Sequence, residues 1–408
     1  MLDVLKGLRV IEGSAFVAAP MAGMTLAQMG AEVIRFDRIE GGLDHRRWPV
    51  SAEGVSHFWA GLNKGKRSFA VNMKSPEARE LISELVCAPG PDAGILLTNL
   101  RVRGWIDYET LSARRKDLIM VSILGDRRGR PAVDYTVNPA AGYPDATGAE
   151  GSTEPVAHVL PAWDCICGHM AALGVMGAER RRSRTGEGDH VEVTVKDVAA
   201  AITGHLGILG EAQETGEDRA KVGNALYGAY GQDFLCADGR RVMVIGLTDR
   251  QWRNLMAATG TEAAMADLAE RLGTDLGREG ERFRARHEIT AVLAPWFAAR
   301  GVADFAEDFD ARGVTWSVFR SFRQALAEDP DFSAENPLFT EIRQPGLGVQ
   351  LSPGLPLHFE KAGRGEARPA PALGGDTEAI LADVLGLPAT AIDRSEEHTS
   401  ELQSRMFI

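Results

Sequence analysis

The sequence predicts an α/β fold in which helices cover both faces of a parallel sheet. Through the first third of the chain, short β-branched runs alternate with stretches of helical periodicity, a pattern typical of such sheets. With 408 residues, 44% of them hydrophobic, the chain is long enough for two or three domains and a large core.

Each element of the predicted sheet has a local signal. The predicted strands are the apolar runs at residues 8–12, 32–36, 68–72, 94–98 and 118–122. Between the first two, residues 18–30 carry apolar side chains at helical spacing and end at Gly30, which favours a helix terminus. Ser75-Pro76-Glu77 combines a cap residue, a first-turn proline and an acid near the helix start, and predicts a helix to about Val86.

The middle of the chain alternates less regularly. Residues 127–160 are rich in Gly, Pro, Asp and Thr, which predicts a loop region with a functional role. After it we expect a helix over 162–179, a basic turn over 180–188, a strand over 190–195 and a helix from 197 to about 210.

A change of pattern after residue 210 predicts a domain boundary. The polar segment 211–222 is expected to be a linker. A hairpin that turns at Asp238-Gly239, followed by charged helices, predicts a smaller α+β domain over residues 223–330. The large domain is expected to comprise residues 1–210 and 331–393.

Charge and composition exclude several functional classes. The net charge of −12 argues against a nucleic-acid-binding protein, whose surface would be basic, but leaves room for arginines that hold a phosphate-bearing ligand. Four cysteines, no signal peptide and no His cluster at ligand spacing predict a cytoplasmic protein without disulfides or a metal site. No apolar run reaches the roughly 20 residues of a membrane span, so no membrane partner is expected.

Motifs exclude further enzyme classes. The chain contains neither GxxxxGK[ST] nor G-x-S-x-G, which argues against a P-loop NTPase and an α/β-hydrolase. The turn over residues 13–20 is rich in small residues but lacks the dinucleotide fingerprint G-x-G-x-x-G. It is either a simple tight turn or a place where a ligand approaches backbone N–H groups at a helix start.

Asp164 is the sharpest candidate catalytic residue. It lies at the start of a predicted helix whose neighbouring side chains are apolar and small. One interpretation is a helix cap. The other is a carboxylate nucleophile that attacks an acyl carbon and is kept ionised by helix-start N–H groups. Helical periodicity does not decide between them.

Several motifs together resemble CoA-transferase family III, which contains formyl-CoA and carnitine CoA-transferases and 2-methylacyl-CoA racemases. The similar segments are residues 5–12, 26–35, Asn63-Lys64-Gly65-Lys66-Arg67-Ser68, Thr98-Asn99-Leu100 and Arg184-Thr185-Gly186-Glu187-Gly188. The resemblance covers about residues 5–393 and places Asp164 at the position of the family's catalytic aspartate. It implies a Rossmann-like large domain, two chains interlocked as a homodimer, and an acyl-CoA thioester as substrate.

The resemblance also implies binding residues. CoA is expected as part of the substrate, with no tightly bound cofactor. The positions that match CoA contacts are Arg38, Val71, Asn99, Leu100, Arg101 and Arg103. For each arginine the alternative is an ordinary solvated side chain. The expected substrate pocket comprises Ser14, Ala15, Phe16, Val17 and Tyr135.

Within the family, three segments are most similar to members that act on one C5 dicarboxylic acid, mesaconate. These segments are residues 12–20, 134–139 and 158–164. The expected activity is transfer of CoA between the C1 and C4 carboxyl groups of that acid, through mixed-anhydride and aspartyl-CoA intermediates. The alternatives are transfer between two separate acids, racemisation of a 2-methylacyl-CoA, and a catalytically idle CoA-binding protein.

Departures from the family pattern bear on these alternatives. Val17 and Thr136 stand where formyl-CoA transferases carry Gln and Glu, which argues against exchange with oxalate or formate. No His lies beside Asp134, where racemases carry an acid/base pair, which argues against racemisation. The presence of Asp164 argues against an idle binding protein.

The end of the sequence does not follow the family pattern. The resemblance stops at about Asp393, and residues 394–408 read like a translated sequencing adapter, so we expect a non-native tail. Without it the net charge would be −11, because three Glu and two Arg are removed.

Overall fold

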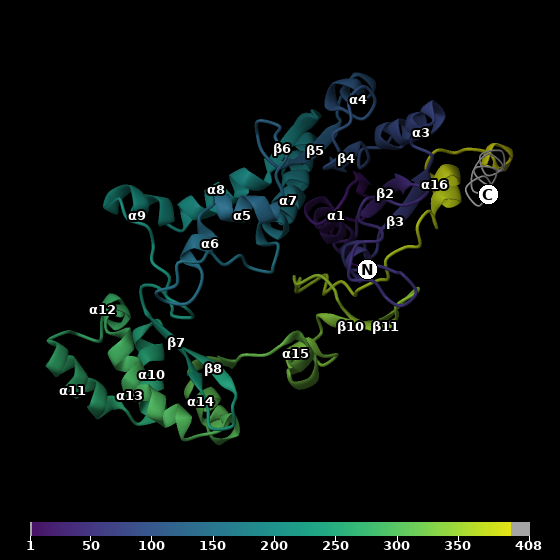
Figure 1. The fold of residues 1–408 in the computed structure, drawn as a ribbon. Coiled ribbons are helices and arrows are strands. Elements are labelled where there is room, and N and C mark those ends of the chain that lie inside the picture. The colour runs from purple at the N-terminus through teal and green to yellow at the C-terminus, as the bar shows by residue number, and fades with distance from the viewer. Residues whose placement is uncertain (1, 393–408) are drawn as a thin grey trace. The chain divides into compact units, whose positions relative to one another are not determined.

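The computed structural model describes residues 2–392, and the chain forms two compact units. The described part of the first unit consists of residues 2–141, 159–210 and 330–392, and the second unit consists of residues 142–158 and 211–329. Figure 1 follows the elements in chain order. The segment 394–408, expected to be non-native, lies outside the described residues. The assignment of CoA binding and catalysis to the first unit stays a prediction.

The first unit is built on a six-stranded parallel sheet of order β3-β2-β1-β4-β5-β6, which confirms the predicted α/β class. The strands are β1 (Arg9–Gly13), β2 (Glu32–Arg38), β3 (Arg67–Val71), β4 (Ile95–Thr98), β5 (Ile119–Leu124) and β6 (Asp189–Thr194). The order reverses between β1 and β4, as in Rossmann-type doubly wound sheets. An antiparallel hairpin of β10 (Phe339–Gln344) and β11 (Gly348–Pro353) belongs to the same unit.

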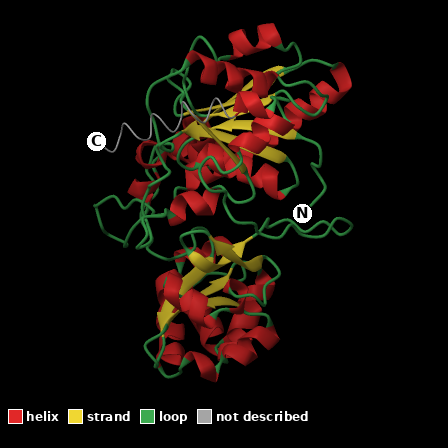
Figure 2. Cartoon of the chain, turned by 90° about the vertical axis from the view of Figure 1, so that its right-hand side faces the viewer, coloured by secondary structure: helices red, strands yellow, loops and turns green. Residues whose placement is uncertain are grey.

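Helices cover both faces of this sheet (Figure 2). Successive residues of a strand point to opposite faces, so the apolar strands present side chains that must be buried on both sides. The main helices are α1 (Ala18–Gln28), α2 (His57–Leu62), α3 (Pro76–Cys87), α4 (Tyr108–Arg114), α5 (Asp134–Ala140), α7 (Ala162–Thr185), α8 (Val195–His205) and α16 (Thr377–Asp383). Ile11 packs in a core with residues of α3, α4 and α16. The next residue, Glu12, faces α1, where a Cβ on Gly23 would collide with its carboxylate.

Helices α1 and α7 pack along each other and carry one wall of the site described below. Gly168 permits this close packing, because a Cβ there would lie 2.7 Å from the carbonyl oxygen of Ala18. Helix α7 also contacts β5 and β6. Its first residue is therefore fixed relative to the carboxyl ends of the strands.

The second unit contains an antiparallel sheet of β7 (Tyr230–Leu235), β8 (Arg241–Gly246) and β9 (Thr315–Val318). Its helices are α6 (Tyr143–Ala146), α10 (Asp249–Thr259), α11 (Glu262–Leu272), α12 (Glu279–Arg284), α13 (Arg286–Ala298), α14 (Ala306–Arg312) and α15 (Phe322–Glu328). The predicted hairpin is present, with Gly239 in its turn at a φ of 77°. Phe234 and Phe297 stack at 4.3 Å between ring centroids inside its core. No helix among residues 2–392 is long and apolar enough to cross a bilayer.

Three segments differ from the sequence prediction. The loop expected over residues 127–160 contains α5 and α6, and Pro139 inside α5 masked the helical pattern. Helix α7 continues through most of the expected basic turn, because Arg182 is buried and donates to the carbonyl oxygen of Ala93 at 2.7 Å. The expected linker begins inside α9 (Ile208–Thr215).

Candidate active site

The candidate site lies at the carboxyl ends of β1 and β4, where the strand order reverses. Ligands of doubly wound folds bind at this point, because the chain leaves the two strands in opposite directions and opens a crevice. The turn after β1 and the segment Asn99–Arg101 after β4 line a cavity of about 770 Å³ together with Asp164. All residues that line this cavity belong to the first unit.

Asp164 is the third residue of α7 and is half-buried. Burial and the neighbouring carboxylate of Asp134 raise the pKa of Asp164 to about 6, while Arg47 acts in the opposite direction. Within residues 2–392, no side chain donates a hydrogen bond to this carboxylate. Asp164 is thus more basic than a solvated aspartate, still largely ionised at neutral pH, and open to an electrophile.

Asp134, and not Asp164, caps the start of α7. The N-cap residue Pro161 supplies no side-chain hydrogen bond. The Asp134 carboxylate instead accepts from the backbone N–H groups of Trp163 at 2.7 Å and Asp164 at 3.1 Å. The helix-start N–H groups were expected to hold the Asp164 carboxylate, and that expectation is wrong. Asp134 is 1% exposed, and its other oxygen has no hydrogen-bond partner among the described residues.

The turn after β1 is held by polar side chains from other segments. The amide of Asn99 accepts from the N–H of Ala15 at 2.9 Å and donates to the carbonyl oxygen of Ala15 at 2.7 Å. Asp44 accepts from the N–H of Phe16 at 3.0 Å. Phe16 has a φ of 68°, a left-handed conformation found at no other non-glycine position in residues 2–392. This conformation costs roughly 1–2 kcal/mol, which these hydrogen bonds offset.

A buried cluster of charged side chains supports the same turn from within the fold. Arg35, 1% exposed, pairs with Asp44 at 2.8 Å and donates to the carbonyl oxygen of Ser14 at 3.2 Å. Glu12 accepts from Lys66 at 2.8 Å and from the Ser14 hydroxyl at 2.5 Å. Burial lowers the pKa of Lys66 to about 8, although the adjacent Glu12 favours its charged form. Removing one partner would leave an uncompensated buried charge, so the cluster rigidifies the turn.

The structure brings most of the predicted site residues together. Those that line the cavity are Ala15, Phe16, Val17, Asn99, Leu100, Arg101, Tyr135 and Asp164. Ser14 does not line the cavity; its buried hydroxyl donates to the carboxylate of Glu12.

Three predicted CoA contacts lie elsewhere. Arg38 is exposed, with Glu40 at 3.9 Å. Val71 packs against the core shared by α3 and α16, and Arg103 is exposed. None of the three lines the cavity around Asp164, and their contact with CoA stays a prediction.

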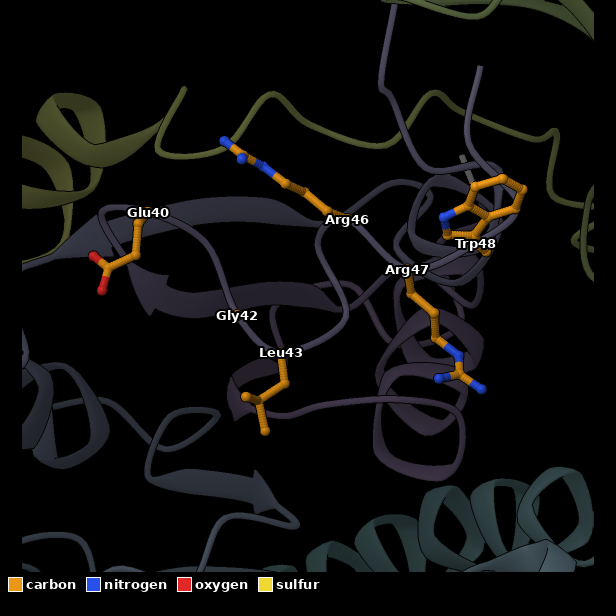
Figure 3. Close-up of a pocket in the computed structure, with 6 residues that line it drawn as sticks. All are labelled: Glu40, Gly42, Leu43, Arg46, Arg47 and Trp48. Atoms are coloured by element: carbon orange, nitrogen blue, oxygen red, sulfur yellow. The ribbon is translucent and has the colours of Figure 1, made fainter. Parts of the chain in front are cut away.

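Sequence reasoning missed Arg47, which lines the cavity from the loop before α2. Its guanidinium lies over the rings of Phe16, at 5.7 Å, and Phe58, at 5.1 Å. Figure 3 shows Arg46 and Arg47 pointing in different directions around a second cavity of about 750 Å³, beside Trp48. The only sequence signal was a pair of adjacent arginines, which is usually a solvated feature.

The motif Arg184–Gly188, one of the motifs that carry the family resemblance, lies at the opposite end of α7. Gly186 ends the helix in the left-handed conformation, with a φ of 73°. A Cβ on Gly188 would lie 2.0 Å from the carbonyl oxygen of Leu118. The motif therefore has a structural role. Within residues 2–392, no three His, Cys, Asp or Glu side chains are grouped to hold a metal ion.

The chain is similar to known proteins in sequence and in structure. The sequence profile of CoA-transferase family III matches residues 5–377. The chain is 53% identical over 395 residues to a 2-methylfumaryl-CoA isomerase from Chloroflexus aurantiacus, with 97% of each protein covered. It is 27% identical to a succinate–glutarate CoA-transferase from Agrobacterium fabrum, covering 95% of this chain and 97% of that protein. A CaiB/BaiF family protein from Brucella suis is 25% identical with a TM-score of 0.76, covering 94% of this chain and 100% of that one.

Proposed function

The chain belongs to CoA-transferase family III, and from this premise we propose that it moves CoA between the two carboxyl groups of mesaconate, converting 2-methylfumaryl-CoA into 3-methylfumaryl-CoA. The observation that carries the proposal is the position of Asp164 at the crevice of the sheet, as a half-buried carboxylate to which no side chain of residues 2–392 donates a hydrogen bond. The choice of acid rests on the similarity to the Chloroflexus isomerase over nearly the whole length of both chains.

The first half of the proposed reaction transfers CoA to the enzyme. A carboxylate oxygen of Asp164 attacks the thioester carbon, the C–S bond breaks, and CoA leaves as the thiolate, so that a mixed anhydride forms. The thiolate then attacks the aspartyl carbon of the anhydride. The bond from that carbon to the bridging oxygen breaks, which yields an aspartyl-CoA thioester and the free dicarboxylate. Neither step consumes or releases a proton, and covalent catalysis divides one difficult transfer into two easier ones.

The second half returns CoA to the other end of the acid. The dicarboxylate turns over in the cavity, and its second carboxylate attacks the aspartyl-CoA thioester. This attack expels CoA thiolate and forms a second mixed anhydride. The thiolate then attacks the substrate's carbonyl carbon in that anhydride, and the Asp164 carboxylate leaves. The freed acid must stay in place, and the apolar walls that Phe16, Val17 and Val133 provide would exclude water and keep its effective concentration high.

The CoA moiety is proposed to lie along the segment after β4. Both polar groups of the Asn99 amide already bind the backbone of Ala15, so its role is to fix the turn. Leu100 and Arg101 line the cavity and are the proposed contacts for CoA. Arg38, Val71 and Arg103 are proposed for its more distant nucleotide end. We further propose that the enzyme acts in the cytoplasm as a homodimer and binds no separate cofactor.

Incubation of the purified protein with 2-methylfumaryl-CoA alone tests this function. We expect 3-methylfumaryl-CoA to accumulate without any added acid, and isotopically labelled mesaconate in the buffer to stay out of the thioester pool. Liquid chromatography with mass detection measures both. Label incorporation as fast as isomerisation would identify an intermolecular transferase and overturn the proposal.

A further inference from the structure

Three arginines line the cavity around Asp164: Arg47, Arg101 and Arg130. Two of them are already engaged with the protein. Arg101 donates to the carbonyl oxygen of Gly129 at 2.6 Å, and Arg130 pairs with Asp126 at 2.7 Å. Among the described residues, the guanidinium of Arg47 lies over two aromatic rings and forms no ion pair or hydrogen bond. Arg47 therefore offers the cavity a cation whose hydrogen-bond donors are free.

The exposed Arg47 side chain is bordered by two aromatic rings. It lies over Phe16 and Phe58, and contacts over a ring face leave the in-plane N–H groups available to a ligand. The backbone of Phe16 is held in the strained turn, because its N–H donates to Asp44. The Arg47 guanidinium thus lies beside two aromatic rings and keeps its N–H groups available to a ligand.

The Arg47 guanidinium and the Asp164 carboxylate line the same cavity without forming an ion pair. Arg47 is close enough to favour the ionised form of Asp164, yet no Arg47 nitrogen lies within 4.0 Å of the Asp164 carboxylate. Its neighbour Arg46 points away and lines only the second cavity (Figure 3). Of the two adjacent arginines, Arg47 alone faces the nucleophile.

We propose that Arg47 binds the free carboxylate of the substrate while the thioester carbon lies at Asp164, and so selects thioesters of dicarboxylic acids. This inference rests on the proposed function. With C1 at Asp164, the C4 carboxylate lies at Arg47, and after the acid turns over the two ends exchange places. One guanidinium thus serves both half-reactions and retains the freed dicarboxylate between them, through paired charge-assisted hydrogen bonds.

A pair of thioesters that differ only in the free carboxylate tests the proposal. 2-Methylfumaryl-CoA carries it, and tiglyl-CoA has a methyl group in its place. Calorimetric titration measures the affinity for both thioesters in proteins that also carry Asp164→Asn, so that neither thioester reacts during the measurement. Arg47→Gln should weaken binding of 2-methylfumaryl-CoA about 30- to 100-fold, since a hydrogen-bonded charge is lost, and change tiglyl-CoA binding less than about twofold. Arg47→Lys keeps the charge but cannot form paired hydrogen bonds with a carboxylate, so its affinity for 2-methylfumaryl-CoA should fall about tenfold.

The matched control is Arg46→Gln, which removes an equal charge one position away and should keep the preference for the dicarboxylic thioester. Circular dichroism checks that each variant is folded. If Arg47→Gln weakens both thioesters equally, or neither of them, Arg47 does not bind the carboxylate and the proposal is wrong. If the wild-type protein fails to isomerise 2-methylfumaryl-CoA but the Arg47-dependent preference is observed, the proposed function fails while the role of Arg47 stands.

Discussion

The two ends of α7 differ in what their residues contribute. At its start, half-buried Asp164 lies near the fully buried carboxylate of Asp134, and both burial and the neighbouring charge disfavour ionisation of Asp164. At its end, buried Arg182 donates to the carbonyl oxygens of Ala93 and Asp117, at 2.7 and 3.3 Å, where the chain enters β4 and β5. The carboxylate at the start of the helix has no hydrogen-bond donor among the described residues, whereas the arginine at its end is bonded to backbone carbonyl groups.

Within one helix of 24 residues, the residues at the start are those of the proposed reaction and the residues at the end stabilise the fold. A reactive carboxylate must be partly desolvated and poorly compensated, and such a group destabilises the fold that holds it. The other end carries the recognisable family motif but lies away from the cavity. Substitutions at the two ends should therefore have opposite consequences for activity and stability.

The largest effect is expected for Asp164→Asn. Turnover should fall by at least about 10⁴-fold, because the nucleophile is lost. The same change should stabilise the protein. The folded-state pKa of Asp164 is raised to about 6, so the folded state binds this proton more tightly than the unfolded state, and stability from this group falls as pH rises from about 4 to 6. Above that range the neutral Asn variant should be more stable by about 1–3 kcal/mol.

Urea unfolding of both proteins from pH 4 to pH 7.5 measures this stability difference, which should grow with pH and then level off. Hydroxylamine trapping should detect an acyl intermediate only in the wild-type protein. A variant that retains turnover would remove Asp164 from its proposed role. If the stability of the variant relative to wild type decreases from pH 4 to pH 7, burial and Asp134 do not disfavour the ionised form of Asp164.

At the other end of α7, Gly188→Ala should lower stability without changing the chemistry. The added Cβ would lie 2.0 Å from the carbonyl oxygen of Leu118 and 2.5 Å from the carbonyl carbon of Asp117, and these backbone atoms lead into β5. We expect a loss of about 2–4 kcal/mol in the free energy of unfolding, from overpacking against backbone. The turnover number per folded molecule should stay within about twofold of wild type.

Gly186→Ala is the control from the same motif. Gly186 has a φ of 73°, but no atom lies within 4 Å of a Cβ placed there. The expected loss is only about 1–2 kcal/mol, from the left-handed backbone alone. Equal losses in the two variants would show that the contact with Leu118 is not what restricts position 188.

The strands and most helices of the first unit could be predicted, because each has its own local signal of hydrophobic periodicity, capping or turn residues. Asp164 could be predicted too, since it begins a helix and matches a family position. The contacts of Asp134 and Arg47 could not be predicted from the sequence. Asp134 acts on backbone groups about 30 residues away, from α5, which Pro139 concealed. Arg47 depends on rings that only the folded chain brings beneath it.

Asp134→Asn gives the smallest effect and the sharpest test of the start of α7. The amide oxygen can still accept from the N–H groups of Trp163 and Asp164, but the negative charge that helps raise the pKa of Asp164 is gone. Activity requires ionised Asp164, so kcat/KM of the wild-type protein should fall as pH drops through about 6. In the variant this acid limb should move to lower pH, because only burial then raises the pKa.

Asp134→Ala separates the charge of Asp134 from its capping role. It removes the charge and also the cap, so the free energy of unfolding should fall by about 1 kcal/mol while the acid limb shifts in the same direction as in Asp134→Asn. A limb that moves only in the Ala variant would mean that Asp134 acts by placing the helix start, since the Asn variant keeps the hydrogen bonds. A limb that moves equally in both would assign the shift to repulsion between the two carboxylates. In that case the buried oxygen of Asp134 without a hydrogen-bond partner has a function: it keeps a negative charge beside the nucleophile and makes Asp164 more basic.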